Sequence, residues 1–191
     1  KLTIFAAIVI LFVGASWVIK VANSSHNIPI IKEIPNFSFI DQDGGEFDNR
    51  SFENKITVLD FIFTNCTGPC PTMALNMYDL YDNFRNVPEV QFISITVDPI
   101  NDTSEKLKEY SQNIGVIDNR WKFLHSSMSE VKSLKQDGFL LYADELPMGH
   151  AIKFILIDQD GKIRKYYDGT DEMSQKILNK DITILVNELR S

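Results

Sequence analysis

The chain contains two cysteines, Cys66 and Cys70, and both lie in one short segment between a predicted strand and a predicted helix. Residues 55–63 are mainly apolar and predict a strand buried on both faces, and a helical pattern begins near Pro71. The partial positive charge at a helix N-terminus favours the thiolate of a nearby cysteine. Thiolates attack disulfides and bind soft metal ions. The segment is therefore where the sequence predicts thiol or metal chemistry.

The spacing of the two cysteines allows three interpretations. Three residues separate them, whereas the common redox motif has two. A pair at this spacing can close a disulfide if its Cα atoms lie within about 7 Å, and it can also supply two thiolates to one metal ion. Gly68 permits a backbone angle that other residues resist, and Pro69 stiffens the turn. Metal binding, thiol–disulfide exchange and a purely structural disulfide in an exported domain are all open at this point.

Three segments of the chain together resemble the SCO/SenC family of membrane-anchored, thioredoxin-like copper proteins that serve cytochrome c oxidase assembly. Residues 60–71 contain Asp-Phe-Ile-Phe-Thr followed by Cys-x-x-x-Cys-Pro. Residues 94–103 resemble the family's Val-Asp-Pro…Asp-Thr stretch, and His150, ahead of a predicted strand, occupies the place of the family's metal-binding histidine. The resemblance covers about residues 33–191.

This resemblance implies a copper site, for Cu(I) or Cu(II), formed by Cys66, Cys70 and His150, with Asp98 close to the metal ligands. Copper(I) favours soft thiolates, and imidazole accepts either oxidation state. The resemblance also implies a partner, the oxidase subunit that carries the binuclear copper centre. It further implies that the protein is a metallochaperone rather than an enzyme. The simpler interpretation of Asp98 is a turn residue, because Asp before Pro99 commonly starts a turn.

The alternative function is a membrane-anchored thiol–disulfide oxidoreductase without a metal role. In that case one of Cys66 and Cys70 attacks a target disulfide, and the other resolves the mixed disulfide. His150 would then be dispensable, or would only tune thiol acidity. Substitution of this histidine therefore distinguishes the two functions.

The chain departs from the family pattern at two places that bear on metal affinity more than on fold. Residues 67–69 read Thr-Gly-Pro, where the family usually begins with Pro and often includes Asp. Met148 and Gly149 precede His150, where the family usually has Asp. The first departure affects thiol acidity, and the second removes a hydrogen-bond partner of the imidazole.

Four other side chains could bind a metal, but each has a simpler interpretation. Met73 and Met77 are thioethers, yet their spacing on the apolar face of the predicted helix favours the core. His26 lies in a polar tether, which rarely holds a ligand in place. His125 is expected in a loop beside a helix cap formed by Ser126 or Ser127.

The N-terminal segment predicts a membrane anchor. Residues 2–19 carry no charged side chain and would span about 27 Å as a helix, close to the ~30 Å hydrocarbon core of a bilayer. We therefore expect a transmembrane anchor over residues 1–20, a polar linker over 21–32 and the domain over 33–191. A cleaved signal peptide is the alternative, because residues 14–16 are small.

Composition disfavours one class of function and supports a folded domain. The 191 residues carry a net charge of −7, and this acidity disfavours nucleic-acid binding, which needs clustered Lys and Arg. The hydrophobic content of 44% is enough for a real core. We expect a bacterial inner membrane with the domain on its periplasmic or outer face, and a mitochondrial inner membrane as the less favoured alternative.

The pattern of predicted elements indicates an α/β class. A β-hairpin over residues 37–47 precedes alternating strands and helices, and a second hairpin over residues 151–168 leads to a last helix over about 172–189. Alternating βα units followed by a hairpin and a helix predict a thioredoxin-like fold with an N-terminal β-hairpin extension.

Overall fold

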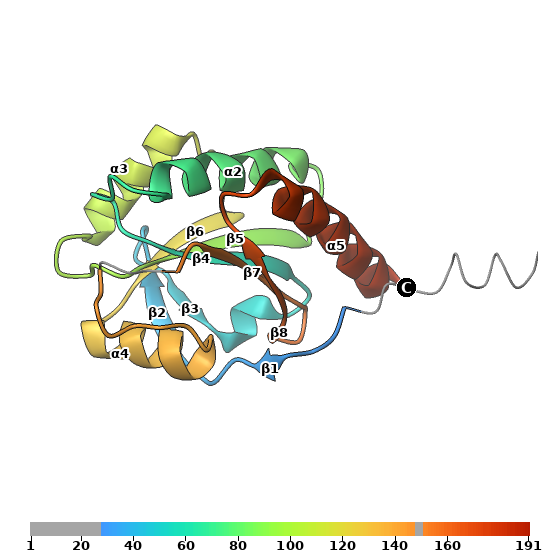
Figure 1. Cartoon of the computed structure of the whole chain (residues 1–191), viewed down its shortest axis with the longest axis horizontal. Coiled ribbons are helices and arrows are strands. Elements are labelled where there is room, and N and C mark those ends of the chain that lie inside the picture. Colours follow the sequence, from blue (N-terminus) through green and yellow to red (C-terminus); the bar gives the residue numbers. More distant parts are fainter. Residues whose placement is uncertain (1–27, 148–150) are drawn as a thin grey trace, which may run out of the picture.

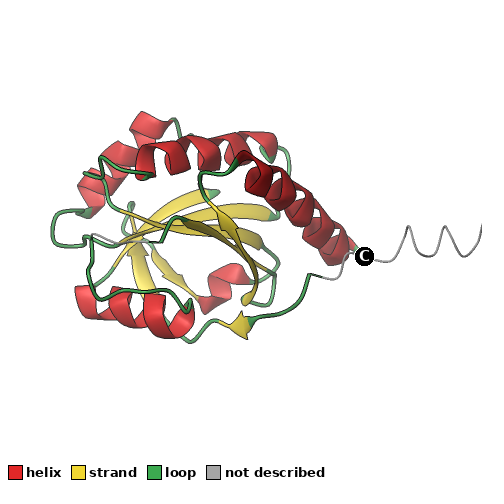
Figure 2. Cartoon of the chain, viewed as in Figure 1, coloured by secondary structure: helices red, strands yellow, loops and turns green. Residues whose placement is uncertain are grey.

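The computed structural model of the protein describes residues 28–147 and 151–191. Figures 1 and 2 show a twisted sheet with helices on both faces. The elements in chain order are β1 (Lys32–Glu33), β2 (Ser38–Asp41), β3 (Glu46–Asp48), η1 (Asn49–Phe52), β4 (Ile56–Ile62), α2 (Cys70–Asn83), β5 (Val90–Thr96), α3 (Ser104–Ile114), β6 (Trp121–His125), α4 (Met128–Ser133), η2 (Leu134–Gly138), β7 (Lys153–Ile157), β8 (Lys162–Asp168) and α5 (Glu172–Arg190).

The strands of the described residues form one eight-stranded sheet in the order β1-β8-β7-β4-β5-β6-β2-β3. β4, β5 and β6 are parallel neighbours, whereas β7 pairs antiparallel with β4, and β8 pairs antiparallel with β7. This arrangement confirms the predicted thioredoxin-like α/β fold. The N-terminal hairpin is not a separate appendage, because β2 pairs with β6 and so extends the same sheet.

The central strand β4 is buried on both faces, as its apolar run predicts. Val58 and Ile62 belong to the core beneath α2, α3 and α5, whereas Leu59 and Phe61 belong to the core beneath α4 and the hairpin. Figure 1 shows α2, α3 and α5 on one side of the sheet and α4 on the other. Because side chains alternate along a strand, one seven-residue segment holds two cores together.

Two predicted core positions and one predicted cap are confirmed. Met73 and Met77 are both 0% exposed and lie in the core under α2. Ser127 caps α4, where its side chain accepts from the backbone N–H of Glu130 and the Glu130 side chain accepts in return. This helix keeps α-helical form only to Ser133 and then widens into the π-helical turn η2.

The segment before the first core strand contacts the domain. Ile28 is buried, and its carbonyl accepts a hydrogen bond of 2.9 Å from the Arg164 Nε atom. The Ile31 N–H donates to the Ile163 carbonyl at 2.8 Å, next to the β1–β8 pair. Residues 28–32, which the sequence assigns to the linker, therefore lie against β8.

Within residues 28–147 and 151–191, none of the helices combines the length and the apolar character needed to cross a membrane. The predicted transmembrane anchor over residues 1–20 and His26 lie outside the described residues.

Candidate metal centre

Cys66 and Cys70 lie at the carboxyl end of β4, the central strand of the sheet. Cys70 is the first residue of α2, which begins close to Pro71 as the helical pattern predicts. Cys66 lies in the preceding loop, where its N–H donates to the Phe63 carbonyl at 3.2 Å. The Cys66 side chain lies within hydrogen-bonding reach of the Cys70 thiol. Cys66 is partly exposed and Cys70 is 1% exposed, so a partner molecule reaches Cys66 first.

The protonation of Cys70 differs from the expectation drawn from its place at a helix N-terminus. Burial raises the pKa of the Cys70 thiol above its usual range, and the hydrogen bond to Cys66 raises it further. A hydrogen bond with the Phe63 backbone lowers the pKa but does not compensate. Loss of water around a buried sulfur outweighs the helix dipole, so the thiol rather than the thiolate is favoured.

Asp60 is a buried carboxyl group in β4 whose role was not predicted from the sequence. It is 1% exposed, and burial raises its pKa to about 7. The Ser94 hydroxyl donates to Asp60 Oδ1 at 2.6 Å, and the Trp121 indole N–H donates to Ser94 Oγ at 3.0 Å. The available sequence signal was a single acidic residue inside a mainly apolar central strand.

Several ionisable groups share one neighbourhood on the α2–α3 side of the sheet. The pKa of Tyr110 in α3 is raised by burial first and then by the negative charges of Asp60, Cys70 and Cys66. The charge of Asp60 likewise contributes to the raised pKa of Cys70. Like charges so close together disfavour one another, and together with burial this favours the protonated forms of Asp60, Cys70 and Tyr110.

Asp102 fixes the loop that carries Cys66, a role that the sequence analysis did not foresee. Asp102 is 0% exposed and accepts from the Thr64 N–H at 3.0 Å and from the Thr64 hydroxyl at 2.5 Å. It also accepts from the Thr96 hydroxyl at 2.6 Å. The Asp102 carboxylate thus ties the backbone after β4 to the end of β5. The point of attachment on the β4 side is Thr64, two residues before Cys66.

Asp98, predicted to lie close to the metal ligands, has the contacts of a turn residue in the structure. Its carboxylate accepts from the Asn101 amide at 3.0 and 2.9 Å, and its carbonyl accepts from the backbone N–H groups of Asn101 and Asp102. It is 8% exposed. Its role beside a metal ion stays a prediction.

His150 lies outside the described residues, so its place beside the two cysteines stays a prediction. Among the described residues, no group of three His, Cys, Asp or Glu side chains is placed to hold a metal ion. His125 ends β6, and its Nε2 atom is hydrogen-bonded to Ser104 Oγ at 2.7 Å. This contact agrees with a structural rather than a ligating role.

The donor atoms of the described site fit a copper ion in type. Cys66 and Cys70 bring two sulfur atoms within hydrogen-bonding reach of each other, and soft sulfur ligands suit copper(I). Cys66 is open to an incoming molecule, whereas Cys70 is held in the core. The same pair can also form a mixed disulfide and then an internal one.

Comparison with known proteins identifies the family. The SCO1/SenC family profile matches residues 29–186. The chain is 32% identical over 162 residues to the SCO1 protein homolog of Bacillus subtilis, covering 81% of this chain and 83% of that protein.

Two solved structures share the fold. BsSco, described as a member of the Sco family of cytochrome c oxidase assembly proteins with a disulfide switch, aligns with a TM-score of 0.74 and 30% identity, covering 83% of this chain and 96% of that one. Bradyrhizobium japonicum ScoI with copper bound aligns with a TM-score of 0.68 and 22% identity, covering 81% and 99%. By its sequence and its fold, the chain belongs to the SCO1/SenC family.

Proposed function

We propose that the protein is a copper-binding assembly factor that uses Cys66, Cys70 and His150 to deliver copper to the binuclear copper centre of cytochrome c oxidase, or to prepare the cysteines of that centre. The observation that carries the proposal is the pair of neighbouring cysteine side chains at the carboxyl end of β4. The copper-bound ScoI structure and the assembly role stated for BsSco support it.

In this proposal copper is the cargo, and the protein's own residues determine how it is held and released. Cys66 and Cys70 supply two soft donors, and Asp102 holds the loop of Cys66 in place through Thr64. Because Cys66 is the more exposed sulfur, the acceptor protein would contact it first. The proposal includes residues 1–20 as a membrane anchor, with the domain outside a bacterial inner membrane.

Metal loading tests the proposal directly. The chain from residue 28 contains only two of the three histidines, His125 and His150, so the tether histidine cannot contribute. We expect one tightly bound copper per protein, with visible thiolate-to-Cu(II) absorption, in the parent chain and in the control His125→Ala. Both signals should be lost in His150→Ala. Undiminished copper binding by His150→Ala would show that the three-ligand site is wrong.

Thiol–disulfide exchange is a second candidate, favoured by the unequal exposure of the two cysteines and by the disulfide switch described for BsSco. The Cys66 thiolate would attack one sulfur of a target disulfide and expel the other as a thiolate. Cys70, after losing its proton, would attack Cys66 and release the second target thiolate. Two electrons pass to the target, which becomes a dithiol, while Cys66 and Cys70 become a disulfide.

Single-cysteine variants separate the two functions. Cys70→Ser should trap a mixed disulfide through Cys66 if exchange occurs, because the resolving thiol is missing. Reductase activity that persists in Cys66→Ser would contradict the mechanism in which Cys66 attacks and Cys70 resolves.

A further inference from the structure

Gly169 connects the helix that begins with Cys70 to the strand that follows His150. Its N–H donates to the Ile152 carbonyl at 3.1 Å, at the end of the β7–β8 ladder. Its carbonyl accepts from the Asn76 Nδ2 atom of α2 at 2.8 Å. One residue therefore bonds, through its backbone, to the helix of one proposed metal ligand and to the strand beside another.

Gly169 is buried against α2, and its position leaves no room for a side chain. A Cβ atom on Gly169 would lie 2.9 Å from Met73 Cε and 3.0 Å from Met73 Cγ. Both distances are shorter than the separation of about 3.5–4.0 Å at which carbon atoms make contact. The terminal methyl group of Met73 can rotate away, but Cγ is held because the helix restricts χ1. The backbone at residue 169 thus approaches α2 this closely only because it carries no side chain.

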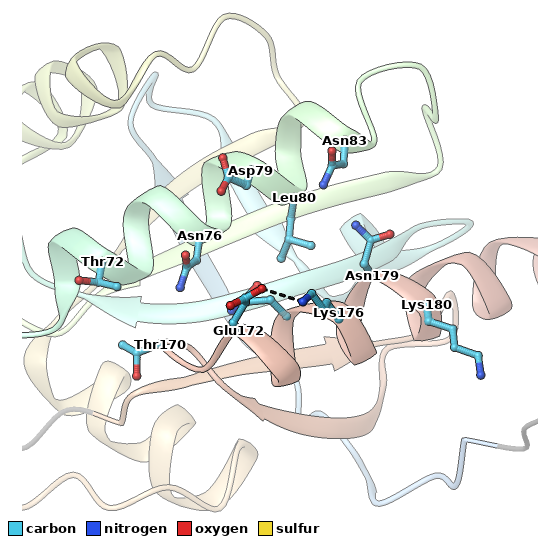
Figure 3. A pocket seen from close by; sticks show the side chains of 11 residues that line it. Thr72, Asn76, Asp79, Leu80, Asn83, Thr170, Glu172, Lys176, Asn179 and Lys180 are labelled. Atoms are coloured by element: carbon cyan, nitrogen blue, oxygen red, sulfur yellow. Dashed lines mark hydrogen bonds and ion pairs between the residues drawn. The ribbon is translucent and has the colours of Figure 1, made fainter.

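The part of α2 that contacts Gly169 is the part that carries a thiol. Met73 is 0% exposed and follows Cys70 by three residues, so the two side chains lie on the same face of the helix. Figure 3 shows Asn76, three residues further along, on the side of α2 that faces Thr170, the residue after Gly169. Because both Met73 and Asn76 contact Gly169, the separation between the start of α2 and the end of β8 is fixed at this residue.

On its other side, Gly169 holds the residue just before β7. The side chain of Ile152 is 38% exposed and contributes little packing there, so the backbone hydrogen bond to Gly169 restrains it. His150 precedes Ile152 by two residues in the sequence, and the place of Ile152 therefore limits where the histidine can reach. A shift of Gly169 relative to α2 would change the separation available between His150 and Cys70.

We propose that Gly169 is a positioning residue of the copper site, which sets the separation between Cys70 and the chain that carries His150. This inference rests on the proposed function, because it concerns the geometry in which the three proposed ligands converge. Gly169 supplies no donor atom to the metal. Its part is to let the end of β8 lie against Met73 while its N–H holds Ile152.

A thermodynamic cycle between Gly169 and His150 tests this inference. The copper(I) affinity of the 191-residue chain in detergent micelles would be measured without oxygen, by competition with a coloured copper(I) chelator. We expect Gly169→Ala to weaken copper(I) binding about tenfold, which is typical of changes to groups that orient metal ligands. In a His150→Ala background, where the two thiols alone hold the ion more weakly, the same change should alter the affinity by less than about twofold.

Two variants show whether the effect acts through the contacts of Gly169. Met73→Ala removes the Cγ, Sδ and Cε atoms that crowd residue 169, so Gly169→Ala/Met73→Ala should recover most of the lost affinity. Asn76→Ala breaks the hydrogen bond to the Gly169 carbonyl without adding bulk, and it should weaken binding about threefold. This second variant also tests the inference if Gly169→Ala does not fold.

Gly45→Ala is the matched control, because a Cβ there would lie 2.9 Å from the Asp41 side chain, in the β2–β3 hairpin on the far side of the sheet from β8. This variant should bind copper(I) like the parent. An equal loss on Gly169→Ala in the parent and His150→Ala backgrounds would indicate a general defect and overturn the inference. So would unchanged affinity in both Gly169→Ala and Asn76→Ala. Equal affinity of the parent and His150→Ala would overturn the three-ligand site of the proposed function, and the positioning inference with it.

Discussion

Replacement of Asp60 by Asn should reduce the pH dependence of the protein's stability. Burial raises the pKa of Asp60 from 3.8 to about 7 in the folded protein. Between those two values the folded state holds a proton that the unfolded chain has released. The free energy of unfolding therefore falls as pH rises from about 4 to about 7, and it stays reduced at higher pH. An amide side chain has no proton to exchange in this range, so the Asp60→Asn variant should lack this contribution.

The expected magnitude follows from the pKa change. A rise of about three pH units corresponds to about 4 kcal/mol, because each unit is worth about 1.4 kcal/mol at 25 °C. The sequence pI of about 4.9 makes solubility poor near pH 5. Between pH 5.5 and 8.5, the fall due to Asp60 should be about 2 kcal/mol, which urea denaturation can resolve.

The assay compares Asp60→Asn with the parent chain from residue 28, using urea denaturation followed by Trp121 fluorescence at pH 5.5, 7.0 and 8.5. In the parent, Asp60 Oδ1 accepts a hydrogen bond of 2.6 Å from the Ser94 hydroxyl. The Oδ1 atom of the introduced Asn can accept the same bond. The contributions of the other titrating groups cancel when the free energy of unfolding of Asp60→Asn is subtracted from that of the parent. Asp79→Asn removes an exposed carboxylate and controls for the lost charge. A difference between parent and Asp60→Asn that is constant across this range would refute the reasoning from burial.

Three further predictions concern other groups of the domain. Asp102→Asn should lower the free energy of unfolding in urea by about 3 kcal/mol, because a fully buried carboxylate loses hydrogen bonds from hydroxyl and amide donors. Burial lowers the pKa of Lys135 to about 8, so between pH 8 and 10.5 the unfolded chain holds a proton that the folded protein has released. Over this range the free energy of unfolding of the parent in urea should rise by up to about 3 kcal/mol relative to that of Lys135→Met. Iodoacetamide at pH 8 should modify Cys66 well before Cys70, as peptide mass spectrometry would show, because Cys70 is buried and its pKa is raised.

The sequence predicts those parts of the fold that have a strong local pattern. The apolar run of β4, the hairpin of β2 and β3, and the capped start of α4 all appear where they are expected. The two-residue strand β1 and the short helix η1 were not foreseen. β1 is too short to show a period, and it exists because its backbone pairs with β8 about 130 residues later. The π-helical turn η2 likewise depends on packing rather than on a residue pattern.

The candidate site was predictable in its residue types but not in its protonation. The spacing of Cys66 and Cys70 indicated one shared site, and the structure places their side chains in contact. The helix N-terminus predicted a thiolate, yet Cys70 is favoured as a thiol because the packing of α2 on the sheet removes its water. Burial of this kind is a property of the assembled core, and no local pattern in the sequence reports it.

Two buried acids near the thiols have different contacts, and this difference separates their roles. Asp102 accepts from three donors on two strand ends, so its carboxylate is saturated and its effect is to fix the backbone before Cys66. Asp60 accepts from one side chain, Ser94, and is otherwise surrounded by core, so its charge is poorly stabilised and its pKa rises. Asp102 thus governs where Cys66 lies, whereas the charge on Asp60 influences when Cys70 can lose its proton. Copper affinity should respond to both acids, but the pH dependence of the thiol chemistry should respond chiefly to Asp60.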